Sequence, residues 1–235
     1  MLNARNPAES EAFEQIRWRL PEYWMLALSA AAWVTLAARS AVHVHQPGAV
    51  SNWWHWMLMV AAMMLPLKID GVRRIAEYSL WSRRHRAIAG YLVGYLSVWA
   101  AVGVPLAWAF SAFEISHRID WRVGAAIGYF VAAAWLVTPW KAVGERMCHR
   151  TMPLAPTGWR ADRDCLGYGW IAGCGCALNC WPLMLVCWLS AHSIIAMIFG
   201  FVLGWADRHY TVNYKLSAVA TAALGIAFGV FSQIR

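Results

Sequence analysis

The chain has 235 residues, of which 60% are hydrophobic and only 14% are charged, and this composition excludes an ordinary soluble domain. Its formal net charge is +8. Most charged residues lie between long apolar runs, so the positive charge fits the cytoplasmic loops of a membrane protein facing anionic lipid. Nucleic acid binding is not needed to explain it.

Apolar runs of near-membrane length follow one another along almost the whole chain. Residues 1–21 are polar and lack the apolar core of a signal peptide, so we expect a short cytoplasmic segment there. The apolar runs lie at 22–41, 52–67, 87–110, 121–140, 168–190, 192–206 and 212–232. They predict an all-α, polytopic membrane helix bundle, with residues 22–235 as one transmembrane domain.

Seven spans are expected, or six if 166–206 forms a single span, and the glycines in 166–179 also allow a re-entrant segment there. With seven spans and the N-terminus inside, sixteen of the twenty Lys and Arg residues lie on the cytoplasmic side. Six spans would place fifteen inside. The positive-inside rule therefore fixes the orientation, with loops 68–86 and 141–165 in the cytoplasm, but does not fix the number of spans.

Four of the six cysteines lie within fourteen residues, from Cys174 to Cys187. On a helix, Cys176, Cys180, Met184 and Cys187 have i, i+4, i+8, i+11 spacing and share one face, whereas Cys174 points elsewhere. Thiolate and thioether sulfurs are ligands for soft metals, Cu(I) above all. This face predicts a copper site, although cysteine and methionine also occur as ordinary apolar packing residues.

A second span repeats part of this pattern. His55-Trp-x-Leu-Met59 matches Cys180-Trp-x-Leu-Met184, and the two spans are expected to be antiparallel. Counting inward from the outer surface, we expect His55, Met59 and Met63 to face Cys187, Met184 and Cys180. His192, with His43 and His45 in the first outer loop, could receive the ion before it reaches the sulfurs.

Other interpretations of the sulfur residues remain open. Cys148-His149 could bind metal from the cytoplasm, but no second ligand pair follows at zinc-finger spacing. A thiol oxidoreductase is disfavoured because the chain has no Cys-x-x-Cys pair. No Walker loop or dinucleotide fingerprint is present, so an enzyme is less expected than a binding protein. The main alternative is a structural or assembly subunit of a membrane complex that binds no metal.

Several motifs together resemble a bacterial family known as predicted metal-binding integral membrane proteins, a domain of unknown function. They are Trp56-x-x-Met59-x-x-Ala62-Met63-Met64-Leu65-Pro66, Gly94-Tyr95-x-x-Val98-Trp99, Thr138-Pro139-x-Lys141 and Cys180-Trp181-x-Leu183-Met184. The chain departs from the family pattern at Asn179 and Gly144, where the family has cysteines, and at His192-Ser193, where it has Met-Asn. The resemblance implies a metal-binding protein of the bacterial inner membrane.

The combined expectation is a membrane protein that binds a soft metal, most simply Cu(I), for trafficking, storage or delivery to a partner protein. The expected ligands are Cys176, Cys180, Met184, Cys187, Met59, Met63, His55 and His192. The expected partners are the lipid bilayer and a protein that donates or receives the metal.

Overall fold

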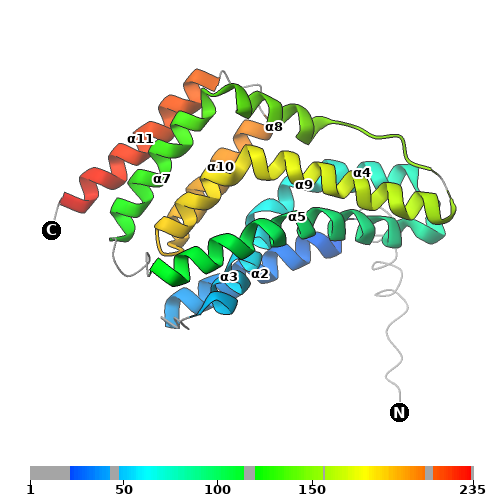
Figure 1. The fold of residues 1–235 in the computed structure, drawn as a ribbon, viewed down its shortest axis with the longest axis horizontal. Helices are drawn as coiled ribbons and strands as arrows, with labels where there is room; N and C mark the ends of the chain where they lie inside the picture. Colours follow the sequence, from blue (N-terminus) through cyan, green and yellow to red (C-terminus); the bar gives the residue numbers. More distant parts are fainter. Residues whose placement is uncertain (1–21, 43–47, 114–119, 156, 210–213, 234–235) are drawn as a thin grey trace, which may run out of the picture.

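In the computed structural model, residues 22–42, 48–113, 120–155, 157–209 and 214–233 are described. Within these ranges the chain forms nine α-helices and two short 3-10 helices, without a β-strand (Figure 1). The prediction of an all-α fold is therefore confirmed. The expected N-terminal segment and the histidines His43 and His45 lie outside the described residues.

Each apolar run of the sequence corresponds to one long helix, and four short helices lie between the long ones. The longer helices are α2 (Tyr23–Val42), α3 (Ala49–Met64), α5 (Arg84–Phe113), α7 (Trp121–Leu136), α9 (Gly158–Leu189), α10 (Ile194–His209) and α11 (Tyr214–Gln233). The short helices are α4 (Ile69–Tyr78), α8 (Pro139–His149) and the 3-10 helices η1 (Pro66–Lys68) and η2 (Trp81–Arg83).

The number of spans differs from the prediction of seven. By length and apolar composition, three described helices could each cross a membrane: the α5 segment Arg84–Ala112, α9 and α11. The count reaches five if α3 with the segment Pro66–Tyr78, bent by 49°, and α7 with α8, bent by 80°, each form one span. Of the remaining helices, α10 has only 16 residues, or about 24 Å, which is shorter than a hydrocarbon layer of about 30 Å.

Helix α9 lies at the centre of the arrangement and packs against α5, α7, α8 and α10 (Figure 1). Glycines at its surface permit this. A Cβ added to Gly169 would lie 2.0 Å from the carbonyl oxygen of Tyr91 on α5, and one added to Gly175 would lie 2.7 Å from the backbone nitrogen of Cys148 on α8. On α7, Gly124 approaches the backbone of Leu189 in the same way. The backbones of three helices therefore reach α9 without intervening side chains.

The segment 166–179 is part of the continuous helix α9 and does not form a separate re-entrant element. Pro182 lies inside the helix, and Figure 1 shows that α9 changes direction along its length. A proline cannot donate the i to i−4 hydrogen bond and displaces the preceding turn, which accounts for a bend in this part of the helix.

Close packing at Gly169 predicts a strong position-specific effect of one added methyl group. Gly169→Ala should lower the free energy of unfolding by about 1–3 kcal/mol, because the new Cβ overlaps the Tyr91 carbonyl. Gly167→Ala is the matched control: it lies two residues away on the same helix with nothing within 4 Å of its Cβ. It should leave stability unchanged or raise it by about 0.5–1 kcal/mol. Thermal unfolding in detergent measures both, and equal effects would contradict the packing described here.

Candidate metal centre

Three sulfur atoms from two helices meet in the interior, and we call Met64, Cys176 and Cys180 the inner sulfur cluster. The Sγ atom of Cys176 lies 4.0 Å from the Sδ atom of Met64 on α3 and 4.0 Å from the Sγ atom of Cys180, one turn later on α9. All three side chains are buried. The predicted one-face arrangement of Cys176 and Cys180 is thus present, and the thioether that joins them is Met64.

Both thiols of this cluster receive a hydrogen bond from a neighbouring side chain. The hydroxyl group of Tyr95 on α5 donates to the Sγ atom of Cys176 at 3.1 Å, and the Asn179 amide donates to the Sγ atom of Cys180 at 3.8 Å. Tyr95 is fully buried. Donors aimed at sulfur stabilise its anionic form, which is the form that binds a metal ion.

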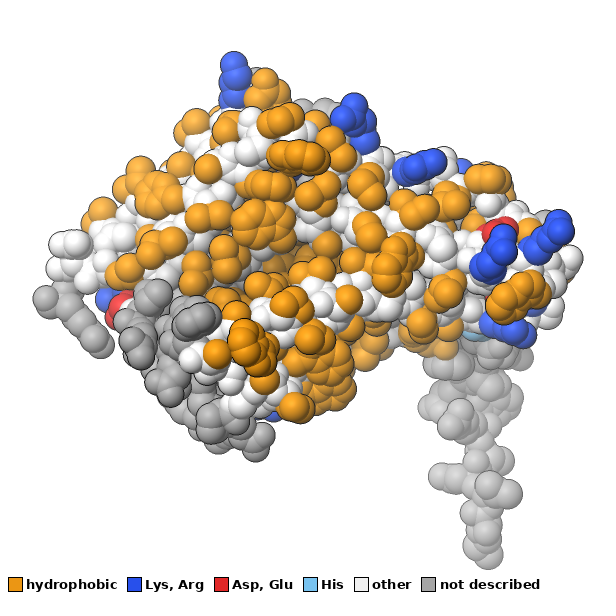
Figure 2. Space-filling view, in the orientation of Figure 1, with side chains coloured by type: hydrophobic (Ala, Val, Ile, Leu, Met, Phe, Trp, Pro, Cys, Tyr) orange, Lys and Arg blue, Asp and Glu red, His pale blue; other side chains and the backbone are white. Residues whose placement is uncertain are grey.

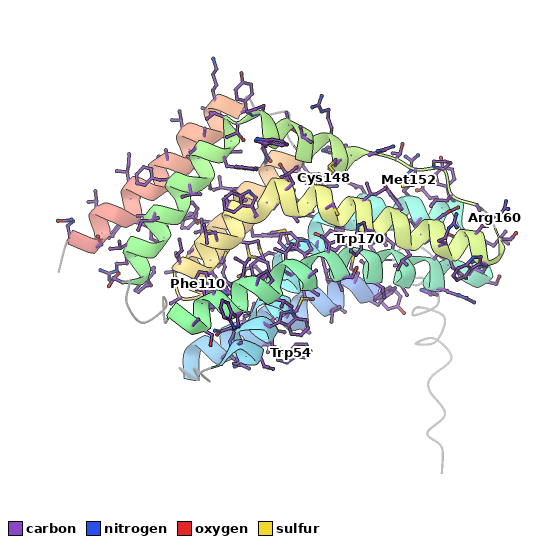
Figure 3. All side chains as sticks on the ribbon, in the orientation of Figure 1. Trp54, Phe110, Cys148, Met152, Arg160 and Trp170 are labelled. Atoms are coloured by element: carbon purple, nitrogen blue, oxygen red, sulfur yellow. The ribbon has the colours of Figure 1, made fainter. Side chains whose placement is uncertain are left out.

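A third thiol and a buried cation complete the surroundings of the cluster. Helix α8 carries Cys148 (labelled in Figure 3), which lines the same small pocket as Cys176 and Cys180. The Nζ atom of Lys68 lies 3.7 Å from the Sγ atom of Cys148 and 5.4 Å from the centre of the Tyr95 ring. Lys68 reaches this position because Pro66 ends the regular helix α3 and the chain turns inward at η1.

A small pocket connects these thiols with polar side chains of α8 and α10. It is lined by Leu67, Glu145, Cys148, His149, Cys176, Asn179, Cys180, Gly204, Asp207 and Arg208. Burial, together with the charge of Arg208, lowers the pKa of His149 below its ordinary value and favours its neutral imidazole. A neutral imidazole is the metal-binding form of histidine.

A second set of potential ligands includes Cys187, near the end of α9, and His192, just beyond it. The Sγ atom of Cys187 lies 3.6 Å from the Sδ atom of Met63, and the rings of His55 and His192 have centroids 5.4 Å apart. We call these four residues the outer group. Together with the Met64–Cys176 contact, they show that side chains of α3 and of the α9 region meet in antiparallel order, as the sequence predicted.

His192 owes its position to the end of α9. Its backbone N–H donates to the carbonyl of Cys187 and that of Ala191 donates to the carbonyl of Trp188, which together form a Schellman motif. Ala191 and His192 both have positive φ angles, 49° and 60°, although glycine is usual at the first of these positions. This turn directs the chain back and brings His192 to His55.

The pairing of individual residues differs from the expected register. The sequence placed His55 beside Cys187 and Met63 beside Cys180, whereas the structure places His55 beside His192 and Met63 beside Cys187. Met59 and Met184 are fully buried. In the described part of the chain, the sulfur contacts between α3 and α9 run through Met63 and Met64.

Four residues of this region were not among the expected ligands: Met64, Tyr95, Cys148 and Lys68. The sequence pattern predicted Met63 as the ligand instead of its neighbour Met64. Cys148 was considered only as part of a separate cytoplasmic site, because sequence spacing does not show that α8 folds back onto α9. Within the described residues, no group of three or more His, Cys, Asp or Glu side chains is arranged to hold a metal. The inner sulfur cluster contains two such residues and obtains its third donor from methionine.

Comparison with protein families places this chain beside copper chaperones. A family model described as "PpoB2: Copper chaperone" matches residues 53–231, about three quarters of the chain, and includes every residue of the inner sulfur cluster and the outer group. Neither the curated proteins nor the solved structures contain a match.

The burial of the thiols predicts their order of reaction. Cys174 is partly exposed, whereas Cys148, Cys165, Cys176, Cys180 and Cys187 are buried. A membrane-permeant maleimide should therefore label Cys174 first in the folded protein, and the other five thiols only after unfolding in detergent. Mass spectrometry of the labelled peptides gives the order, and Cys174→Ala should abolish the fast phase. Rapid native labelling of Cys176 would contradict the arrangement.

Proposed function

Since the chain belongs to the PpoB2 copper chaperone family, we propose that it is an integral membrane protein that carries Cu(I) at its inner sulfur cluster. Copper is the cargo here, held in the membrane and passed to or from a partner protein. The cluster offers two thiolates and one thioether, the soft donors that Cu(I) prefers.

The observation that supports this proposal best is the spacing of the sulfurs. Metal–thiolate bonds are about 2.3 Å long at zinc, and two sulfurs bound at that distance to a trigonal ion lie about 4 Å apart. The Cys176–Cys180 and Cys176–Met64 sulfur distances are both 4.0 Å. Two of the three sulfur–sulfur distances therefore match the spacing of a trigonal site, both of them measured from Cys176. Such low-coordinate sites suit exchange, because an incoming ligand can bind before another leaves.

The surface of the molecule supports a location in the membrane. Hydrophobic side chains cover much of the face in Figure 2, over α5, α7, α9 and α11, while most of the visible Lys and Arg side chains lie along its upper edge and right end. Exposed apolar residues of α5, α7 and α11 include Val104, Trp108, Phe130, Val219 and Phe231. A continuous apolar surface of this extent belongs against lipid or a partner.

We place the start of α9, α4 and α8 on the cytoplasmic side, following the distribution of basic residues. Seven spans remain our proposal, with the shorter helices crossing beside the longer ones. In this orientation the outer group lies toward the external compartment and the inner sulfur cluster lies nearer the cytoplasm.

Removing both thiols of the inner sulfur cluster tests the proposal directly. Protein purified anaerobically under reducing conditions should contain about one Cu(I) per chain, and Cys176→Ser/Cys180→Ser should lose it, because a hydroxyl is a poor ligand for a soft ion. The double variant Cys165→Ser/Cys174→Ser removes the same number of thiols away from the cluster and should keep the metal. Metal analysis and circular dichroism measure occupancy and folding. Copper-free wild-type protein would favour the assembly-subunit alternative.

Two methionines on α3 provide a finer test. Met64→Leu removes the thioether beside Cys176 and should weaken Cu(I) affinity by more than about tenfold. Losing a residue that only supports the ligands of a metal site already lowers metal affinity by about that factor. Met59→Leu makes the same change in volume at an equally buried position and should leave affinity within about twofold of wild type. Competition with a chromophoric Cu(I) chelator measures both. An equal loss in the two variants would mean that packing, not ligation, is responsible.

The orientation is tested from outside the cell. Ser82 and Val50 are exposed and lie at opposite ends of the proposed bundle. A membrane-impermeant maleimide applied to intact cells should label Val50→Cys and not Ser82→Cys, while permeabilised cells should be labelled at both. Labelling of Ser82→Cys in intact cells would reverse the proposed orientation.

A further inference from the structure

We infer that Cys148 is the transfer thiol of this protein, which takes Cu(I) from the inner sulfur cluster and passes it to an acceptor on the α8 side. The inference rests on the proposed function and goes beyond it, because it assigns a route and a first acceptor. It concerns α8, the short helix whose Cys148 lines the same pocket as Cys176 and Cys180.

The packing of α8 on α9 holds Cys148 against the cluster. Two glycines make the contact: a Cβ on Gly175 would lie 2.7 Å from the Cys148 backbone nitrogen, and a Cβ on Gly144 would lie 3.1 Å from the Asn179 backbone nitrogen. Cys148 is only 8% exposed and lines the same small pocket as the thiols of Cys176 and Cys180. An incoming ligand is thus already in place.

Lys68 supplies the charge that such an exchange needs. Its side chain is 1% exposed, and among the described residues its ammonium group forms no ion pair with a carboxylate. A buried cation without an anionic partner is costly, so an anion is expected beside it. Cu(I) bound by two thiolates carries one net negative charge, which the ammonium group of Lys68 balances.

The small pocket beside the inner sulfur cluster is the route by which Cu(I) leaves the cluster. Its lining combines the buried thiols of Cys148, Cys176 and Cys180 with the exposed side chain of His149 and the half-buried side chain of Asp207. The residue after the transfer thiol is therefore a second potential ligand, and it is exposed. Of the three cysteines, Cys148 is the most exposed and the one next to this histidine.

The transfer step is a ligand exchange without a change of oxidation state. A bond forms between the Sγ atom of Cys148 and Cu(I), and the bond from the Sγ atom of Cys176 breaks. The proton of the Cys148 thiol passes to the departing Cys176 thiolate, its neighbour. The number of thiolates on the ion stays the same, so the site keeps its net charge and Lys68 keeps balancing it.

The experiment measures binding and transfer separately on the full-length chain in detergent. Each protein is loaded with Cu(I) anaerobically, and the transfer of the ion to bicinchoninate is followed by stopped-flow absorbance. Cys148→Ser should retain the copper content of wild type and transfer it at least about tenfold more slowly, the scale expected when a supporting residue of a metal site is lost. Cys165→Ser, a buried thiol outside the cluster, should transfer at the wild-type rate.

A second variant displaces α8 without removing any sulfur. Gly175→Ala should slow transfer and keep the bound copper, whereas Gly167→Ala should change neither. Wild-type transfer by Cys148→Ser would overturn the inference, and so would loss of its copper, which would make Cys148 a permanent ligand. Both results leave the proposed function standing. The proposed function itself is removed by a copper-free wild-type protein, or by full copper retention in Cys176→Ser/Cys180→Ser.

Discussion

The close approach of three helix backbones to α9 is the constraint on which the rest of the structure depends. Where α9 carries Gly169 and Gly175, no side chain separates it from α5 or α8. The first contact brings Tyr95 to Cys176, and the second brings Cys148 to the pocket that Cys176 lines. A cluster of small, soft side chains can form only at such a narrow junction, because a sulfur atom on a cysteine extends little beyond its own backbone.

The same junction explains how a lysine is accommodated in an apolar interior. Lys68 leaves the membrane-facing surface because the chain breaks at Pro66, and it is surrounded by the Tyr95 ring and the Cys148 thiol. A phenol ring and a protonated thiol carry no formal charge, so neither neighbour balances the positive charge of Lys68. Metal binding deprotonates cysteine, and the thiolate that forms supplies the balancing negative charge.

Helix type and burial could be predicted from the sequence, whereas register and the return of α8 could not. Hydrophobic periodicity and length gave the all-α fold, and i, i+4 spacing correctly identified Cys176 and Cys180 as neighbours on a buried face. Counting turns inward from the outer surface predicted the wrong partners for His55 and Met63 on α3. Such a count assumes two straight, parallel helix axes, whereas helices that cross, or that bend as α9 does near Pro182, touch at other turns. Adjacent Met63 and Met64 contact Cys187 and Cys176, which are eleven positions apart on α9, so their side chains must extend in opposite directions.

The length of α5 and α9 has a consequence for how the molecule would meet other proteins. With 30 and 32 residues they measure about 45 and 48 Å, roughly 15 Å more than the hydrocarbon layer requires. Their starting ends lie together, because Asp162 on α9 binds both Arg83 and Arg86. In the proposed orientation, the paired first turns of α5 and α9 extend beyond the lipid on the cytoplasmic side. A protein bound to the end of these two helices would be held at a fixed distance from the membrane surface, whereas a flexible linker would let that distance vary.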